Sequence, residues 1–463
     1  MTAIYSARWV LPIISPAIDN GAVAVDKSEI AAVGPKLEIV SRFPDARVSD
    51  FGEAAILPGL VNAHSHLELT VMRGFLEAEE HDFFAWLRKL TLARMGMTPE
   101  DLRISAKCGA IEAARAGITC MGDSSSSAAE PMRALRETGL RGIVYQESFG
   151  PDPNSADGNV AKLRDQVGEL RRLESNLVRT GVSPHAPYTV SAPQLELISR
   201  LAIDDKLPVM MHAAEAKAEQ LFMMEGRGPF ADGLKRRGID WQPPGISAIQ
   251  YLARHAVLET KPLLAHCVTV SDADIELIRQ SGAGIAHCPK SNAKLGHGRA
   301  PFAQFVAQET RVGLGSDSVA SNNTCDILEE ARFATLLARL PSATDDAARG
   351  ELRPANDLVN ADDALFAATL GGARALGMDN QIGALADSLQ ADIVVIGLNG
   401  AHQQPMQNPT DALIFSSSGG DVLLTIVAGE EIYRNDSAND LELGRLRSEM
   451  RAIRVKLDSL AFT

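Results

Sequence analysis

The chain has 463 residues, 45% of them hydrophobic and 22% charged, which is enough for one large globular domain and a second, smaller one. Its formal net charge of −14 argues against a nucleic-acid partner, because nucleic acids bind to basic surfaces. The five cysteines form no C-x-x-C pair and indicate reduced thiols, and no apolar run approaches the ~18 residues that a membrane span needs. We therefore predict a cytoplasmic protein with neither a nucleic-acid nor a membrane partner.

Both ends of the chain have the pattern of a small β-domain. Residues 1–56 contain short alternating runs broken by turn residues, which indicates an antiparallel module, and strand-like runs return at 386–436. We expect the two segments to build one composite β-sandwich. Residues 437–463 then carry apolar residues three and four apart, the spacing of an amphipathic helix. These residues are Leu443, Leu446, Met450, Ile453, Leu457 and Leu460. We expect this C-terminal helix to pack on the protein's own body.

Between residues 57 and 385, short β-branched runs alternate with longer helical stretches, as in parallel α/β domains. Residues 99–116 and 192–204 are clear helical stretches. The candidate strands are Leu57–Ala63, Ile118–Met121, Gly142–Gln146, Val178–Ser183, Pro208–Met211, Pro262–Ala265, Gly282–Ala286 and Thr310–Gly315. Eight strands with eight crossovers predict a (β/α)8 TIM-like barrel, whose active site lies at the C-terminal ends of the strands.

Histidines gather at these predicted strand ends. His64 and His66 are two residues apart after the first strand, a spacing that points both side chains to one face. The later strand ends carry His185, His212, His266, His287 and Asp317. Imidazoles with one carboxylate suit Zn²⁺, and Fe²⁺ or Mn²⁺ also fits; such an ion makes hydroxide available at neutral pH. The pattern predicts one divalent metal and the hydrolysis or deamination of an electrophilic carbon.

Two residues near these histidines have the chemistry of acid–base catalysis. Glu215 lies three residues past His212 and can shuttle protons, and His266 can stabilise an attacking hydroxide or a tetrahedral intermediate. Rival motifs fail. His66-Leu67-Glu68 mimics the H-x-E of the small zinc deaminases, but no P-C-x-x-C follows it, and the sequence has neither an H-E-x-x-H helix nor a phosphate-binding loop.

The runs PGLVNAHSHLELT, SPHAPYTVS, HAAEAKAE, LAHCV, HCPKSNAKLGHGRAP and GSDSVASNN together resemble the amidohydrolase superfamily, in its cytosine-deaminase-like branch. The resemblance covers nearly the whole chain and implies a barrel, a composite β-sandwich and a mononuclear metal site. The implied metal ligands are His64, His66, His212 and Asp317. Glu215 would protonate the ring nitrogen next to the attacked carbon, and His266 and Asp317 would activate hydroxide and pass its proton to the leaving ammonia. His185 would contact the substrate, and no carboxylated lysine is expected.

The same runs resemble deaminases of adenine nucleosides, including the methylthioadenosine and S-adenosylhomocysteine deaminases. The 226–251 insertion and the HCPKSNAKLGHGRAP run look closer to the aminodeoxyfutalosine deaminases of menaquinone synthesis, which we take as the preferred reading. One departure bears on the ribose: where the adenosylhomocysteine enzymes have an acidic residue two positions before a Trp, this chain has Phe84 before Trp86. Glu147 is a candidate replacement, or else a solvated loop carboxylate. Trp86 is either a ligand-stacking residue or part of the core.

Three alternatives stay open at this point. The enzyme could deaminate methylthioadenosine or adenosylhomocysteine, or it could act on a triazine-like ring by deamination or dechlorination with similar ligands. A more remote alternative is a metal-free barrel that serves as a scaffold. For an enzyme of this kind we expect a small-molecule substrate and a homo-oligomer, a dimer or larger.

Overall fold

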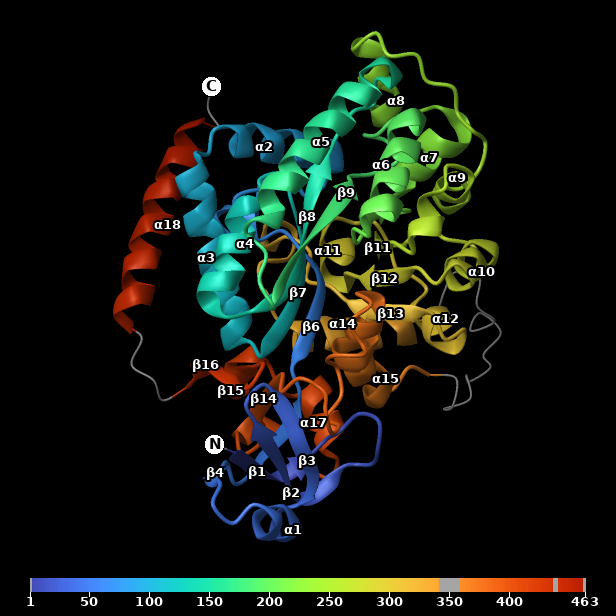
Figure 1. Cartoon of the computed structure of the whole chain (residues 1–463). Helices are drawn as coiled ribbons and strands as arrows, with labels where there is room; N and C mark the ends of the chain where they lie inside the picture. The colour runs from blue at the N-terminus through green and yellow to red at the C-terminus, as the bar shows by residue number, and fades with distance from the viewer. Residues whose placement is uncertain (1, 341–357, 436–439, 461–463) are drawn as a thin grey trace.

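The computed structural model describes residues 2–340, 358–435 and 440–460, and within them a barrel of parallel strands stands above a β-domain built from both ends of the chain (Figure 1). The barrel strands are β6 (Leu60–Ser65), β7 (Ile118–Ser125), β8 (Arg141–Ser148), β9 (Val178–Pro184), β10 (Met210–Ala213), β11 (Leu263–His266), β12 (Gly284–His287) and β13 (Arg311–Leu314). They form two parallel four-stranded sheets, β6–β9 and β10–β13. Isolated parallel bridges join the sheets at both junctions, Val182 with Val209 and Ser65 with Asp317. The predicted (β/α)8 architecture is confirmed.

Helices lie around the outside and the mouth of the barrel (Figure 1). They are α3 (Pro99–Arg115), α4 (Ala129–Thr138), α5 (Ala156–Arg171), α6 (Ala192–Asp205), α7 (Lys217–Glu225), α8 (Pro229–Arg236), α9 (Ala248–Arg254), α10 (Asp272–Ser281), α11 (Pro289–Lys294), α12 (Phe302–Ala307), α13 (Val319–Asn322), α14 (Ile327–Arg339), α15 (Ala361–Phe366) and α16 (Gly372–Ala375). In α3, Thr98 and Asp101 form a reciprocal capping box ahead of a buried stripe that includes Ala106, Ala110 and Ala113. The helix therefore begins where its sequence signals a start. Among the helices of the described residues, none has the length and hydropathy for crossing a membrane.

The β-domain is one hydrogen-bonded network of eight strands from both chain ends. The strands are β1 (Ala3–Val10), β2 (Ile18–Asp26), β3 (Glu29–Pro35), β4 (Arg47–Asp50), β5 (Ala54–Pro58), β14 (Ile393–Gly397), β15 (Val422–Val427) and β16 (Glu430–Arg434). Two helices, α1 (Lys36–Arg42) and α17 (Pro409–Phe415), accompany them. Strand β5 pairs with β1 in parallel and with β14 in antiparallel register. These two pairings join the N-terminal and C-terminal segments, as predicted.

The predicted strand Leu57–Ala63 is in fact two strands, which break at Gly59. Strand β5 ends at Pro58 in the β-domain, and β6 begins at Leu60 in the barrel. A side chain at Gly59 would meet the hydroxyl of Thr119 at 2.1 Å, so only glycine fits at this junction. The chain changes sheets there.

Two further helices lie near the mouth and side of the barrel. Helix α2 (Phe83–Met95) lies near the C-terminal ends of the barrel strands, and α18 (Asp440–Leu460) runs along the outside of α3 (Figure 1). Ile453 and Leu457 of α18 are buried in a cluster with residues of the segment that follows β6, and Leu446 is buried as well. The helix therefore packs on the protein's own body. The side chains of Leu443 and Leu460, also predicted for this stripe, lie outside the part of the chain that the structure describes.

Candidate metal and catalytic site

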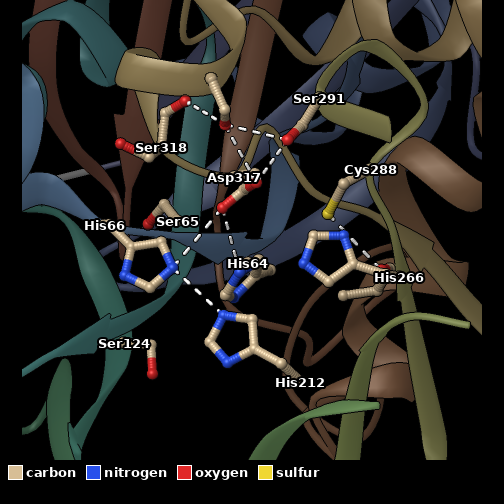
Figure 2. A network of polar contacts seen from close by, with 12 residues as sticks. His64, Ser65, His66, Ser124, His212, His266, Cys288, Ser291, Asp317 and Ser318 are labelled. Carbon is tan, nitrogen blue, oxygen red and sulfur yellow. Dashed lines mark hydrogen bonds and ion pairs between the residues drawn. The ribbon is translucent and has the colours of Figure 1, made fainter. Parts of the chain in front are cut away.

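Four side chains from three barrel strands converge at one end of the barrel (Figure 2). His64 lies in the strand β6, one residue before its end, and His66 follows the strand; His212 lies in β10, and Asp317 follows β13. The His212 Nε2 and His66 Nε2 atoms are 3.3 Å apart. The Oδ1 atom of Asp317 lies 3.4 Å from His64 Nε2 and 3.5 Å from His66 Nε2. The structure thus brings together the four predicted metal ligands.

These separations fit one tetrahedrally held ion. Metal–ligand bonds of about 2.0–2.1 Å at tetrahedral angles place neighbouring ligand atoms about 3.3 Å apart. His64 is fully buried and neither of its ring nitrogens has a hydrogen-bond partner, which is costly unless another group binds it. Burial lowers the pKa of His64 to about 4, so its imidazole is neutral and can donate a lone pair. The donor set fits a single divalent cation.

Neighbouring groups fix which atoms of the ligands face the centre. His212 Nδ1 lies 3.0 Å from the carbonyl oxygen of His185, a contact that makes Nδ1 the donor and leaves Nε2 for a metal. Asp317 Oδ2 accepts hydrogen bonds from the hydroxyls of Ser291 and Ser321, which directs Oδ1 to the histidines. Although burial opposes ionisation of Asp317, its contact with His64 and the adjacent imidazoles hold its pKa well below the usual value. The site is therefore oriented before any ion binds.

Glu215 lies beside this centre, in the loop after β10, and is 5% exposed. Its Oε2 atom accepts a hydrogen bond from the Tyr188 hydroxyl at 3.3 Å. Its Oε1 atom is 3.6 Å from His266 Nε2 and 3.4 Å from His297 Nε2. Burial raises the pKa of Glu215, but His266 and His297 outweigh burial and lower the pKa to about 2. The carboxylate is surrounded by groups that can exchange protons with it.

The loop of Glu215 and the ring of His266 are each held by a buried side chain. Glu219 accepts hydrogen bonds from the backbone N–H groups of Ala214 and Glu215, at 3.1 and 2.7 Å. The Nδ1 atom of His266 is 2.9 Å from the Asn292 Oδ1 atom, so Nδ1 carries the proton. The other ring nitrogen, Nε2, has no hydrogen-bond partner and is free to accept a proton at the centre.

The three predicted substrate-contacting residues line one cavity of about 1270 Å³, which also reaches His66, His212, Glu215, His266 and Asp317. His185 is held by Thr189, with its Nδ1 atom 2.9 Å from the Thr189 hydroxyl. Glu147 accepts a hydrogen bond from Ser126 at 2.6 Å and lies 4.0 Å from His66 Nδ1. It is therefore not a solvated loop carboxylate. Trp86 touches the cavity but is 5% exposed and belongs to an apolar cluster, so its role is mainly in the core.

Several residues of the site have no counterpart among the sequence-based predictions. His297 and Tyr188 contact Glu215, and Asn292 contacts His266. Both His297 and Asn292 lie in the HCPKSNAKLGHGRAP run and Tyr188 lies in SPHAPYTVS, so the runs that carry the family resemblance contained the signal. His287 also ends a strand, but its ring stacks on Phe302 at 5.2 Å and does not line the cavity.

A barrel with three histidines and one carboxylate gathered at its strand ends has an arrangement suited to a metal-dependent hydrolase. The family model described as "Amidohydrolase family" matches residues 55–432. The chain belongs to the amidohydrolase family, as its sequence motifs indicated.

Similar proteins extend over nearly the whole chain. A 5-methylthioadenosine/S-adenosylhomocysteine deaminase of Nitratidesulfovibrio vulgaris is 31% identical over 446 residues, which cover 94% of this chain and 93% of that protein. A protein with the same name from Syntrophobacter fumaroxidans is 30% identical over 440 residues, with 94% and 93% covered. Among solved structures, a zinc-bound adenosine deaminase from Xanthomonas campestris has a TM-score of 0.82 at 28% identity and 98% coverage of both chains. A zinc complex of atrazine chlorohydrolase from Arthrobacter aurescens has the same TM-score at 22% identity, covering 98% of this chain and all of its own, and shares the fold.

Proposed function

We propose that this protein is a metal-dependent aminohydrolase that replaces the 6-amino group of an adenine nucleoside derivative with oxygen and releases ammonia. The observation that carries the proposal is the position of Glu215. Its Oε1 atom is 3.6 Å from His266 Nε2. The carboxylate thus lies beside the four ligand atoms, whose separations suit a single ion. Relatives named as deaminases of adenine nucleosides, matched over 94% of the chain, support the same chemistry.

His64, His66, His212 and Asp317 would hold the metal, most suitably Zn²⁺, with Fe²⁺ or Mn²⁺ as alternatives. A divalent ion there supplies Lewis acidity, which lowers the pKa of water to about 7. Glu215 starts as a carboxylate, takes up one proton of the attacking water and delivers it to the ring nitrogen next to carbon 6, which makes that carbon electrophilic. The free Nε2 atom of His266 accepts the other proton of the attacking water.

The remaining step returns protons to the leaving group. As the carbon–nitrogen bond breaks, the proton that His266 accepted from water passes by way of the His266 and Asp317 side chains to the amino group, which leaves as ammonia. The overall change consumes one water and forms the 6-oxo nucleoside, so its atoms balance without another reactant. The Glu147 carboxylate and the ring of His185 line the cavity beside the ligands, where they can position the purine and the ribose.

The size of the cavity favours an adenosine with an enlarged 5′ substituent. At about 1270 Å³ it exceeds the ~300–1,000 Å³ of ordinary small-molecule pockets. The names of the relatives favour methylthioadenosine or S-adenosylhomocysteine. The 226–251 insertion contributes α8 to the cavity wall. Because this insertion resembles that of the aminodeoxyfutalosine deaminases, aminodeoxyfutalosine stays the preferred substrate, with a role in menaquinone synthesis.

The test is to load the purified protein with Zn²⁺, Mn²⁺ or Fe²⁺ and to supply adenosine, methylthioadenosine, S-adenosylhomocysteine and aminodeoxyfutalosine in turn. Ammonia and the 6-oxo product should appear together, and removal of the metal by a chelator should abolish both. Absence of turnover with all four nucleosides, or turnover of an aminotriazine instead, would overturn the proposal. Failure to bind any stoichiometric metal would support a scaffold role.

A further inference from the structure

The mouth of the cavity carries positive charge on an acidic protein. Four of its lining residues are exposed cations: Arg88 on α2, Lys162 on α5, and Arg236 and Arg237 at the end of α8. Within residues 2–340, 358–435 and 440–460, none of these four side chains takes part in a hydrogen bond or an ion pair. Because the chain has a net charge of −14, an opening lined by four unpaired cations is a local exception.

Two of the helices that carry these cations meet at an aromatic contact. The rings of Phe84 in α2 and Phe230 in α8 are 6.2 Å apart, and Gly233 of α8 faces the Phe84 ring. Arg88 lies one helical turn beyond Phe84, and Arg237 lies one turn beyond Gly233. Residues one turn apart share a helix face. Arg88 and Arg237 therefore both lie next to the contact between α2 and α8 at the mouth.

Nearby carboxylates form no ion pair with these cations in the described part of the chain, and this includes Asp232, which lines a smaller hollow together with Arg236. The Asp82 side chain caps α2, where its Oδ1 atom accepts hydrogen bonds from the N–H groups of Phe84 and Ala85 at 3.0 and 3.1 Å. Deeper in the cavity, Glu68 pairs with Arg94 at 2.8 Å. The cations at the mouth therefore remain available to a ligand.

The wall between the metal ligands and the mouth is largely aromatic. Tyr188, which donates to Glu215, stacks on Phe230 with 3.9 Å between ring centroids. Phe149 lies against His185 at 4.6 Å and is 45% exposed. A substituent that extends from the ribose towards the arginines would run along this apolar wall.

We propose that the mouth is a binding site for a carboxylate at the far end of the nucleoside's 5′ substituent, held by Arg88, Lys162, Arg236 and Arg237. This inference rests on the proposed function, because it takes the adenine ring to lie at the metal ligands. The planar guanidinium group matches a carboxylate with two parallel hydrogen bonds, and three of the four cations are arginines. The enzyme would then select adenine nucleosides with an acidic tail over neutral ones of equal size.

The test compares two synthetic substrates that differ in charge and hardly in size, 5′-deoxy-5′-(3-carboxyphenylthio)adenosine and its methyl ester. The acid should have a kcat/KM about tenfold above that of the ester, mostly through KM, since each exposed ion pair contributes up to about fivefold. The preference should shrink at ~1 M NaCl, where charges are screened beyond ~3 Å.

Variants assign the preference to the mouth. The Arg236→Gln/Arg237→Gln protein, which keeps Arg88 and Lys162, should lose most of the acid-to-ester preference, and Lys162→Gln alone should lower it in part. Arg164→Gln is the matched control, since Arg164 is an exposed cation on α5 that does not line the cavity, and its ratio should equal that of the wild type.

Equal kcat/KM for acid and ester in the wild type at low salt would overturn this inference and leave the proposed function standing. A preference that persists in the double variant would overturn the assignment to these arginines. If the metal-loaded protein turned over neither compound nor adenosine, the proposed function would fall, and this inference with it.

Discussion

His297 and Glu215 lie directly against each other: the His297 Nε2 atom is 3.4 Å from Glu215 Oε1, and the two side chains are 4% and 7% exposed. The ring of Phe83 meets the His297 ring edge-on at 4.4 Å and holds it there. His297 is one of the groups that lower the pKa of Glu215. A histidine from the loop after α11 thus adjusts the acidity of the carboxylate proposed to carry the proton.

Replacing His297 by leucine should impair turnover through Glu215. Loss of the ring removes an interaction that favours the Glu215 carboxylate, so the pKa of Glu215 should rise from about 2 and the acid limb of the kcat–pH profile should move to higher pH. We expect kcat to fall about tenfold to a hundredfold, with a smaller change in KM.

Two further variants separate this effect from a loss of packing. His297→Gln keeps a hydrogen-bond donor and should restore much of kcat and the wild-type acid limb. His255→Gln removes a remote histidine, whose Nδ1 atom is 2.9 Å from Glu196, and should leave the profile unchanged. An unshifted acid limb in His297→Leu would contradict the proposed coupling.

Glu215→Gln should retain the metal and lose nearly all activity. The amide is almost the same size as the carboxylate and leaves the four ligands in place, but it cannot carry a proton to the purine. We expect kcat to fall about 10²- to 10⁴-fold, the range that general acid–base groups contribute. Metal content by elemental analysis and ammonia release are the two measurements. Wild-type turnover in a variant with full metal content would show that another residue carries the proton.

The metal ligands could be predicted from the sequence because they sit at strand ends. Parallel strands of a barrel bring their C-terminal ends to one face, so His64 and Asp317 could be placed together although 252 residues separate them. The i, i+2 spacing of His64 and His66 likewise follows from strand geometry. In regular strands, the position of a residue in the sequence therefore predicts where its side chain lies.

Residues on loops could not be placed in this way. His297 reaches Glu215 only because its loop folds back against Phe83, and no periodicity encodes that path.

The strand break at Gly59 cannot be predicted from the sequence for a related reason. The apolar run continues through Gly59, and only the close approach of Thr119 shows that the chain changes sheets. The acidic residue expected before Trp86 is absent, while Glu147 lies near His66 through strand β8.

Glu330 should make the protein less stable as the pH rises. Burial raises the pKa of this fully buried carboxyl from 4.5 to about 8. The folded state therefore keeps a proton that the unfolded chain releases, so this stabilisation is complete below pH 4.5 and is lost as the pH rises through about 8. The Glu330→Gln variant should gain melting temperature relative to the wild type between pH 5 and pH 8.5, by a few degrees.

The neighbouring residue provides a control of opposite sign. Burial opposes ionisation of Glu329, but its hydrogen bond with Lys290 outweighs burial and lowers its pKa. Glu329→Gln should therefore lose melting temperature relative to the wild type as the pH rises from about 3 to 6. Parallel melting curves for Glu330→Gln and the wild type across both ranges would contradict the role assigned to Glu330.

A buried ion pair joins the barrel to the β-domain. Arg141, at the start of β8, donates two hydrogen bonds to Asp392, at 2.8 and 2.9 Å, and both side chains are at most 2% exposed. Asp392 Oδ1 also accepts from the N–H group of Ala428, in the turn between β15 and β16. Removal of either partner leaves a buried charge without compensation.

Arg141→Met should therefore destabilise the protein by about 3–5 kcal/mol, the range for breaking a buried pair from one side. Adding Asp392→Asn should recover part of this loss, because the amide removes the unpaired charge and its oxygen still accepts from Ala428. The matched control is Arg8→Met, which breaks the exposed 3.1 Å pair with Asp19 and should cost less than ~1 kcal/mol. Urea unfolding of the four proteins measures these differences. If Arg141→Met cost no more than Arg8→Met, the pair would not hold the two domains together, and the packing of β14 and β15 against the barrel strand β7 would have to do so.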